Sequence, residues 1–495
     1  MHTPHSLPAD QAQNELLYAL AQVGNSREHL RIETHVVNER GDTLSSQHSG
    51  KTTDRKIVFF SRCQKNTPER HGSNTRLRLW GVLLKRSPVF LDHFRQIANE
   101  LTRYKAPKSA APALQISAAG ASPKNSSSRK TAVIAMHWLD VGGAEKFAID
   151  SAELASKMGF RVVVICDKPG PLTWLTRIEP FTECIYMLGD LDHLARRSVC
   201  LQLALDIAPE IVHIHHCETV YELLPTIRER GLDALVLDST HIIENRHGGF
   251  VAASQRYSPW IDFHHVISRT LQDFYVEAGI SPEKIQLGYL LKKICLPNNS
   301  EIPISLHSPL RVGFIGRMAQ QKRPYLFVEL ARRLNRLAPK SFRFEMIGEG
   351  ILEHQVKEQV KTDKVLVDIH SSQSDVNKFL SEIDVLVICS DQEGLTLVAF
   401  EAVTNGCAVI STDVGAQREL LDSLTLLPVA PYKFLRAATE LLLKIAKEQV
   451  NLQEIKAKQL ERYVDLLAQR SAIDTCASLY GKALSFEPEQ VASHE

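Results

Sequence analysis

The sequence lacks the features that mark several specialised classes of protein. None of its apolar runs approaches the ~20 residues that a membrane-spanning helix needs, and its first residues lack the basic and apolar regions of a secretory signal. Neither sign of charge is in excess, because 58 Lys and Arg offset 57 Asp and Glu. This balance argues against nucleic acid as a partner. We therefore expect a cytoplasmic protein, at most peripheral on the inner face of a membrane.

No disulfide or zinc framework is evident among the nine cysteines, which are scattered and include no C-x-x-C pair. Cys166, Cys389 and Cys407 lie in or beside apolar strands, where buried free thiols are common. The pattern indicates a reducing compartment.

The order of segments predicts two α/β domains behind an N-terminal extension. Residues 107–130 are rich in Pro, Ala, Ser and Lys, which is typical of a flexible linker, and residues 1–106 before it are basic and partly helical. Beyond the linker, strands and helices alternate in two series joined by a Pro-rich connector. Such alternation predicts parallel sheets with right-handed crossovers. We expect two Rossmann-like domains facing across a cleft, residues 131–300 and 301–450, and a helical segment, residues 451–495.

The strands of these two series are expected where short, β-branched apolar runs occur. In the first domain they are residues 131–136, 161–166, 211–215, 234–238 and 264–267; in the second they are residues 311–315, 343–347, 365–369, 385–389 and 408–411.

The most informative segment is DQEGLTLVAFEA, which lies between two predicted strands of the second domain. Glu393 is expected in a strand-to-helix loop at the carboxyl edge of the sheet, and Glu401 on the helix that follows. A glycine turn that opens a helix aims free amides at an anion such as phosphate. Carboxylates there suit the hydroxyls that flank a phosphate, on a ribose and a sugar. On the pair alone, two surface glutamates are an equally good interpretation.

Two cations follow another predicted strand of the same domain. The strand ends at Gly316, and Arg317 and Lys322 come next. At the carboxyl end of a strand, a guanidinium and an ammonium can neutralise a diphosphate. A solvated basic loop is the alternative. A further strand-to-turn signal, MIGEG, includes Gly348 and is weak by itself.

The first domain carries its own glycine-rich turn. Gly142 and Gly143 follow the first predicted strand and precede a helix, so the backbone there can approach a ligand closely. The spacing is not G-x-G-x-x-G, which argues against a dinucleotide dehydrogenase.

Three histidines at strand ends, His213, His215 and His241, invite a metal site. His213 and His215 alternate along one strand, and no acidic partners complete the site. We therefore expect no metal.

Taken in order, these motifs resemble those of glycosyltransferase family 4, which has E-x7-E, G-R-x4-K, G-x-G and G-G-A-E signatures. The resemblance covers about residues 131–440. It implies the GT-B fold and a retaining transfer, without a cofactor, from a nucleotide-sugar donor to a glycan or lipid-linked saccharide acceptor. Cell-surface polysaccharide biosynthesis is the expected setting.

The resemblance also implies roles for particular residues. Arg317 and Lys322 would stabilise the leaving diphosphate, Glu393 would hold the donor sugar, and His241 would contact the transferred sugar. The implied donor-binding residues are Gly142, Gly143, Gly316, Gly348, Gly394, Leu395, Thr396 and Glu401. The family often has Pro where Ala408 stands, a departure without chemical consequence.

Two other classes of function stay open. One is a different GT-B enzyme, either a sugar phosphorylase or a nucleotide-sugar epimerase. The other is a non-catalytic GT-B scaffold that binds a glycan. The combination of Arg317 and Lys322 with Glu393 and Glu401 favours transfer.

The region of residues 51–105 has two interpretations. It is rich in Lys and Arg, and Phe90, Leu91, Phe94, Ile97 and Leu101 recur at roughly helical spacing. A basic amphipathic helix is typical of peripheral contact with an anionic membrane, where a lipid-linked acceptor resides. Alternatively, the helix packs on the body of the protein or on a partner.

Overall fold

The structure is a computed structural model. It describes residues 30–37, 43–44, 55–62, 87–103, 129–244, 248–291, 308–371 and 374–485. Nearly all of the predicted linker, residues 107–130, lies outside these ranges, as does the Pro-rich connector up to residue 307.

The first domain is built on a ten-stranded sheet in the order β10-β9-β8-β7-β4-β5-β6-β3-β1-β2. Its central strands are parallel, and only β1 pairs in the antiparallel direction, with β2 and β3. The strands are β1 (Leu30–Val37), β2 (Thr43–Leu44), β3 (Arg55–Arg62), β4 (Thr131–Met136), β5 (Arg161–Cys166), β6 (Cys184–Met187), β7 (Ile211–His215), β8 (Leu235–Thr240), β9 (Phe263–Val266) and β10 (Ile285–Leu287).

Helices cover both faces of this sheet. Along β4, Ala132, Ile134 and Met136 belong to one apolar cluster, whereas Val133 and Ala135 belong to another. Side chains alternate between faces of a strand, so a strand buried on both sides reads as a continuous apolar run. The helices are α4 (Gly143–Lys157), α5 (Leu175–Ile178), α6 (His193–Ile207), α7 (Glu218–Glu229), α8 (Gly249–Tyr257) and α9 (Arg269–Glu277).

The second domain has a six-stranded parallel sheet in the order β13-β12-β11-β14-β15-β16. Its strands are β11 (Leu310–Ile315), β12 (Phe342–Ile347), β13 (Asp368–His370), β14 (Val385–Ile388), β15 (Ala408–Thr412) and β16 (Leu426–Leu427). Its helices are α10 (Pro324–Leu337), α11 (Glu353–Thr362), α12 (Val376–Glu382), α13 (Leu397–Thr404), α14 (Gln417–Leu420) and α15 (Pro431–Ala446).

The strand order reverses once within each parallel set. The reversal lies between β4 and β7 in the first domain and between β11 and β14 in the second. Ligands of open α/β sheets bind at the carboxyl ends of the strands beside such a switch point. The predicted α/β architecture of two Rossmann-like domains is confirmed, and every strand expected from the sequence overlaps an observed one.

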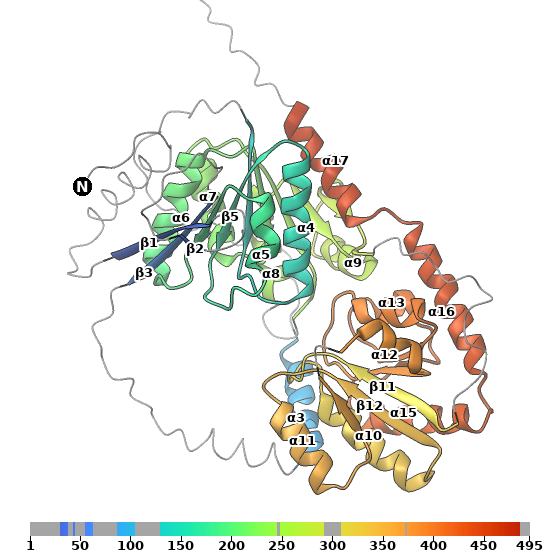
Figure 1. The fold of residues 1–495 in the computed structure, drawn as a ribbon. Coiled ribbons are helices and arrows are strands. Elements are labelled where there is room, and N and C mark those ends of the chain that lie inside the picture. The colour runs from blue at the N-terminus through green and yellow to red at the C-terminus, as the bar shows by residue number, and fades with distance from the viewer. Residues whose placement is uncertain are drawn as a thin grey trace, which may run out of the picture.

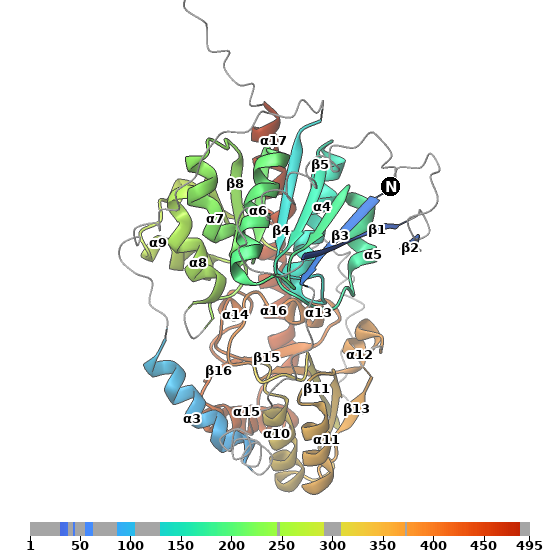
Figure 2. The ribbon, with the colours of Figure 1, turned by 90° about the vertical axis from the view of Figure 1, so that its left-hand side faces the viewer.

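The two domains are stacked, with α13 at their junction (Figures 1 and 2). The C-terminal helices pack on both: α16 (Leu452–Leu467) contacts α13 and β15, and α17 (Ala472–Ser485) contacts α4. Among the described residues, no helix is both long and apolar enough to cross a bilayer.

The N-terminal region is divided between the two domains. Its strand β3 pairs in parallel with β6 and so extends the first sheet. Its helix α3 (Pro88–Leu101) packs on the second domain, against α10 and α15 (Figure 2). The described parts of this region therefore contact both domains.

Candidate active site

The loop that carries Arg317 and Lys322 and the loop that carries Glu393 meet at the switch point of the second domain. Lys322 lies in the loop after β11, and Glu393 lies in the loop after β14, the neighbouring strand. Nζ of Lys322 is 2.5 Å from Oε1 of Glu393. Glu393 is buried, whereas Lys322 is half-buried. The structure thus brings together two residues that the sequence assigned to one site.

The backbones of these loops are also joined. The amide of Asp391 donates to the carbonyl of Gln321, 3.0 Å away, and the side-chain amide of Gln321 donates to the carbonyl of Gln392, also at 3.0 Å. These bonds fix the position of one loop relative to the other, and this position places Lys322 opposite Glu393.

Arg317 differs from Lys322 in its surroundings. Its side chain is exposed at the start of the same loop. Among the residues that the structure describes, no ion-pair or hydrogen-bond partner is found for its guanidinium. A cation held at a switch point without a carboxylate partner is available to an anionic ligand.

Two of the predicted glycines lie where no side chain fits. A Cβ on Gly348 would be 2.0 Å from the carbonyl oxygen of Gly316, and one on Gly394 would be 1.8 Å from that of His241. The second contact joins the two domains, because His241 follows β8. The carboxylate loop therefore rests directly on the backbone of the first domain.

Glu401 also lies at the domain junction. It is half-buried on α13, and burial raises the pKa of its carboxyl, an effect that the charge of Lys146 on α4 opposes. Lys146 belongs to the first domain and follows the glycine turn of Gly142 and Gly143. Sequence analysis did not single out Lys146, because only the docking of the domains brings it near Glu401.

His241 is buried in an aromatic cluster. Its ring lies 5.1 Å from that of His216 and 5.9 Å from that of Phe147, measured between centroids. Burial and the neighbouring His265 lower its pKa to about 3, so the imidazole is neutral at physiological pH. Its Nε2 has no hydrogen-bond partner among the described residues.

The glycine turn of the first domain is shaped by Glu145. Its carboxylate lies 2.7 Å from the indole nitrogen of Trp138 and 2.9 Å from Nε2 of His137. Burial would raise the pKa of Glu145, but the hydrogen bond and charge of His137 lower it below its ordinary value. A Cβ on Gly142 would meet this carboxylate at 2.1 Å, whereas one on Gly143 would meet nothing.

The remaining predicted donor-site residues open helix α13. Leu395 is buried, and Thr396 is the N-cap residue, whose hydroxyl accepts from the side-chain amide of Gln417 at 2.9 Å. His215 packs in the core, and the centroid of its ring lies 3.9 Å from that of His213.

Residues 309–444 match the family model described as Glycosyl transferases group 1. The second domain is thus similar to the group 1 glycosyltransferases, and we call it the glycosyltransferase domain. The match includes Arg317, Lys322, Glu393 and Glu401, the residues whose pattern carried the resemblance in the sequence.

Two curated relatives of the chain are named as bacterial glycosyltransferases. The chain is 25% identical, over 42% of its length and 51% of the relative, to the amylovoran biosynthesis glycosyltransferase AmsK of Erwinia amylovora. It is 25% identical, over 57% of its length and 79% of the relative, to the UDP-Gal:alpha-D-GlcNAc-diphosphoundecaprenol alpha-1,3-galactosyltransferase of Escherichia coli. The chain thus spans about half the length of the first of these relatives.

Solved glycosyltransferase structures share the two-domain fold. Anabaena HepE in complex with UDP-glucose superposes with a TM-score of 0.55 and 15% identity over 72% of this chain and 100% of that one. The lipopolysaccharide outer core galactosyltransferase WaaB superposes with a TM-score of 0.52 and 16% identity over 72% of this chain and 99% of that one. The predicted GT-B fold is confirmed.

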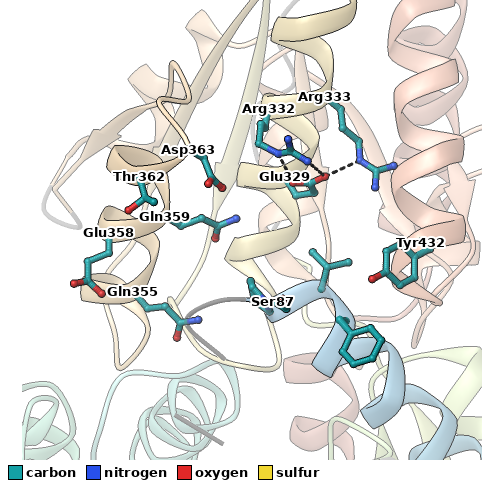
Figure 3. A pocket seen from close by; sticks show the side chains of 13 residues that line it. Ser87, Glu329, Arg332, Arg333, Gln355, Glu358, Gln359, Thr362, Asp363 and Tyr432 are labelled. Atoms are coloured by element: carbon teal, nitrogen blue, oxygen red, sulfur yellow. Dashed lines mark hydrogen bonds and ion pairs between the residues drawn. The ribbon is translucent and has the colours of Figure 1, made fainter. Parts of the chain in front are cut away.

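A groove of about 690 Å³ on the glycosyltransferase domain lies away from these loops. It is bounded by the start of α3, by α10 and by α11, and its polar lining includes Arg332 and Arg333, which both pair with Glu329 (Figure 3). None of the predicted site residues lines it.

Proposed function

We propose that this protein is a retaining glycosyltransferase of family 4, which transfers a sugar from a UDP-sugar to a lipid-linked saccharide. The observation that carries the proposal is the meeting of Lys322 and Glu393 at the switch point, with the exposed guanidinium of Arg317 in the same loop as Lys322. The two cations, Arg317 and Lys322, can bind the two phosphates of a diphosphate, and the carboxylate of Glu393 beside them can accept hydrogen bonds from sugar hydroxyls. UDP is proposed because HepE was solved with UDP-glucose.

In this proposal, catalysis comes from electrostatic stabilisation and positioning. The acceptor hydroxyl attacks the anomeric carbon on the face from which the diphosphate leaves, and the diphosphate takes the proton. Arg317, Lys322 and the free amides at the start of α13 stabilise the developing charge on the leaving group. No protein nucleophile or metal takes part.

The carboxylates and the histidine hold the two sugars. Glu401 accepts from ribose hydroxyls, and Glu393 accepts from the donor sugar. His241 contacts the transferred sugar as a neutral ring, because its low pKa excludes a role as general acid at physiological pH.

The first experiment is isothermal titration of UDP, GDP, ADP and dTDP into the wild type and into Glu401→Gln. We expect UDP alone to bind, and the variant to bind it roughly ten-fold more weakly, because an amide group replaces one carboxylate oxygen as a hydrogen-bond acceptor. Leu366→Ser, at a highly exposed position away from the loops, is the control. Absence of binding by every nucleotide would contradict the proposed donor site.

A second experiment tests the stereochemistry. The anomeric configuration of the first product, read by NMR from a UDP-α-sugar, is expected to be α. A β product would contradict retention, and a requirement for inorganic phosphate would favour a sugar phosphorylase.

We further propose that the protein is peripheral on the inner face of a membrane and binds it through α3. Phe90, Phe94, Ile97 and Leu101 form an apolar stripe on the outer side of this helix, with exposed fractions of 48%, 54%, 42% and 82%. Positions separated by three or four residues share one helical face, so the stripe is continuous. The surrounding sequence is rich in Lys and Arg, which favours an anionic surface. The relative from Escherichia coli, whose name includes diphosphoundecaprenol, supports this setting.

Vesicle flotation tests the membrane contact. We expect the wild type to float with vesicles that contain anionic phospholipid, and the double variant Phe94→Ser, Leu101→Ser to bind several-fold more weakly, since less apolar area is buried. Leu366→Ser again serves as the control, because it removes an equally exposed leucine elsewhere. Unchanged flotation of the double variant would rule out the stripe as the membrane contact.

A further inference from the structure

Helix α3 reaches the glycosyltransferase domain from outside the segment that defines the family. The family match begins at residue 309, whereas α3 spans Pro88–Leu101. It nevertheless packs on this domain, against α10 and α15 (Figure 2). The face that it buries is mainly polar: the buried residues are Leu91, Asp92, Gln96 and Asn99.

Four charged side chains, two of them on α3, form a network between this helix and the second domain. Asp92 lies 3.0 Å from Nε of Arg323, and both side chains are completely buried. Arg95 bridges two carboxylates, with its Nη2 2.6 Å from Asp92 and its Nη1 2.7 Å from Asp391. We call these residues, Asp92, Arg95, Arg323 and Asp391, the α3 network. Its two cations balance its two anions, which offsets the cost of burying them.

The α3 network lies directly behind the proposed donor site. Arg323 is the residue after Lys322, and Asp391 lies in the loop that carries Glu393. The amide of Asp391 also donates to the carbonyl of Gln321, so the two loops are joined at the level of the network. The Lys322–Glu393 pair thus joins the two loops at the proposed donor site, and the buried α3 network joins the same two loops through neighbouring residues.

Arg323 also fixes the local path of the chain. Its backbone is left-handed, with φ 52° and ψ 49°, which is uncommon for a residue other than glycine. Its Nη1 donates to the carbonyl of Val429 at 2.8 Å, and α10 begins at the next residue, Pro324. The buried side chain therefore holds a strained turn that sets where Lys322 points.

We propose that the α3 network positions the two loops that present Lys322 and Glu393, so that a helix from the N-terminal region completes the donor site. Asp92 and Arg95 are positioning residues, because they act through the loops. The identity of the ligand rests on the proposed function, but the bracing of the loops does not.

The test compares Arg95→Gln with the wild type in two ways. Hydrogen–deuterium exchange of the ligand-free protein is expected to rise in both loops, residues 316–323 and 389–396, at a temperature where the variant is folded. The Kd for UDP and the KM for the UDP-sugar are expected to rise roughly ten-fold, because small displacements of positioning groups weaken a site strongly. The KM for the acceptor should stay within two-fold, roughly the measurement error.

Conservative and control variants separate positioning from general stability. Arg95→Lys should recover part of the UDP affinity, because it restores the charge but not the fork that reaches two carboxylates. Arg332→Gln should behave as the wild type, since it removes an ion pair with Glu329 that is not part of the α3 network. Asp92→Asn is a second variant of the network; if it does not fold, the partly exposed Arg95 decides alone.

The proposal is overturned if Arg95→Gln has a lower Tm but unchanged exchange in both loops and an unchanged Kd for UDP. That result would make the network a purely structural contact. If the wild type binds no nucleotide, the proposed function fails, and exchange in the loops still tests the bracing.

Discussion

Glu393 and Glu401 belong to one sequence signature but have different environments. Glu393 is buried and paired with Lys322 at 2.5 Å. Glu401 is half-buried, and desolvation raises its pKa against the opposing charge of Lys146. The first carboxylate pairs with a cation of its own domain. The environment of the second carboxylate depends on how the first domain packs against the second.

In the proposed donor site, the raised pKa of Glu401 is expected to make UDP binding sensitive to acid. The group takes up its proton at a higher pH than the ordinary value of about 4.3. Protonation removes a hydrogen-bond acceptor for the ribose, so UDP affinity should fall as pH falls and recover as pH rises. Titration calorimetry from pH 7.5 down to pH 5 would measure this. Glu401→Gln should lack this component, and an unchanged pH dependence in that variant would contradict the assignment.

Gly394 packs directly against the backbone of the first domain. A Cβ would be 1.8 Å from the carbonyl oxygen of His241, a backbone atom that cannot move aside alone. We therefore expect Gly394→Ala to lower kcat/KM by roughly 100-fold through separation of the domains. Gly481→Ala, in α17, is the control because its Cβ meets nothing within 4 Å. Equal activity of the two variants would show that this contact is not needed.

Among the elements, α3 has an unusual distribution of side chains. Its outer face is apolar, and its inner face carries Asp92, Gln96 and Asn99. The sequence pattern correctly indicated a helix from the spacing of Phe90, Leu91, Phe94, Ile97 and Leu101. It could not tell which face is buried, because that depends on Arg323 and Asp391, charges that lie far away in the chain.

Because the polar face of α3 is buried and its apolar face is exposed, substitutions of its polar residues should destabilise the protein more than substitutions of its exposed apolar ones. Removing Phe94 and Leu101 together should change the free energy of unfolding by only about 0.5 kcal/mol, because both are exposed. Asp92→Ala should lower it by about 3 kcal/mol, since it leaves the buried guanidinium of Arg323 without its carboxylate. Urea unfolding of both variants measures the difference. A greater loss from the apolar variant would mean that the outer face is covered within the protein.

At the scale of the whole molecule, the first domain encloses a cluster of histidines. Burial lowers the pKa of His213, His215, His216, His241 and His265, to about 4 for His265 and about 3 for His241. In the unfolded chain these groups titrate near 6.5. The unfolded state therefore binds more protons than the folded state between these values, and stability falls as pH falls.

The acid sensitivity of this cluster gives a prediction for the whole protein. The free energy of unfolding should have its highest value above pH 6.5. Between pH 6.5 and pH 4 it should decrease by on the order of 3 kcal/mol for a single histidine. His215→Phe should weaken this decline without losing a hydrogen bond, because neither ring nitrogen of His215 has a partner among the described residues. Denaturant unfolding at pH 8 and pH 5 measures it. Equal stability at both pH values would contradict it.

The docking of the domains has a second anchor. The carboxylate of Glu419 on α14 accepts from Thr270, at 3.1 Å from its amide, and from the hydroxyl of Tyr289 at 2.5 Å. Both partners belong to the first domain. Glu419→Ala should widen the angle between the domains, which small-angle scattering would show as a larger radius of gyration. An unchanged radius would show that the domains stay closed without Glu419.

The sequence by itself determined the two parallel α/β domains and the loops that carry Arg317, Lys322, Glu393 and Glu401. Strand periodicity and turn glycines are local properties, and carboxyl ends of neighbouring parallel strands share one edge. Only the tertiary structure decided that Lys146 acts on Glu401, that His241 contacts Gly394, and that α3 pairs its charged side chains with Arg323 and Asp391. Those contacts join segments with no periodic relation in the chain, so packing and the pairing of buried charges select them.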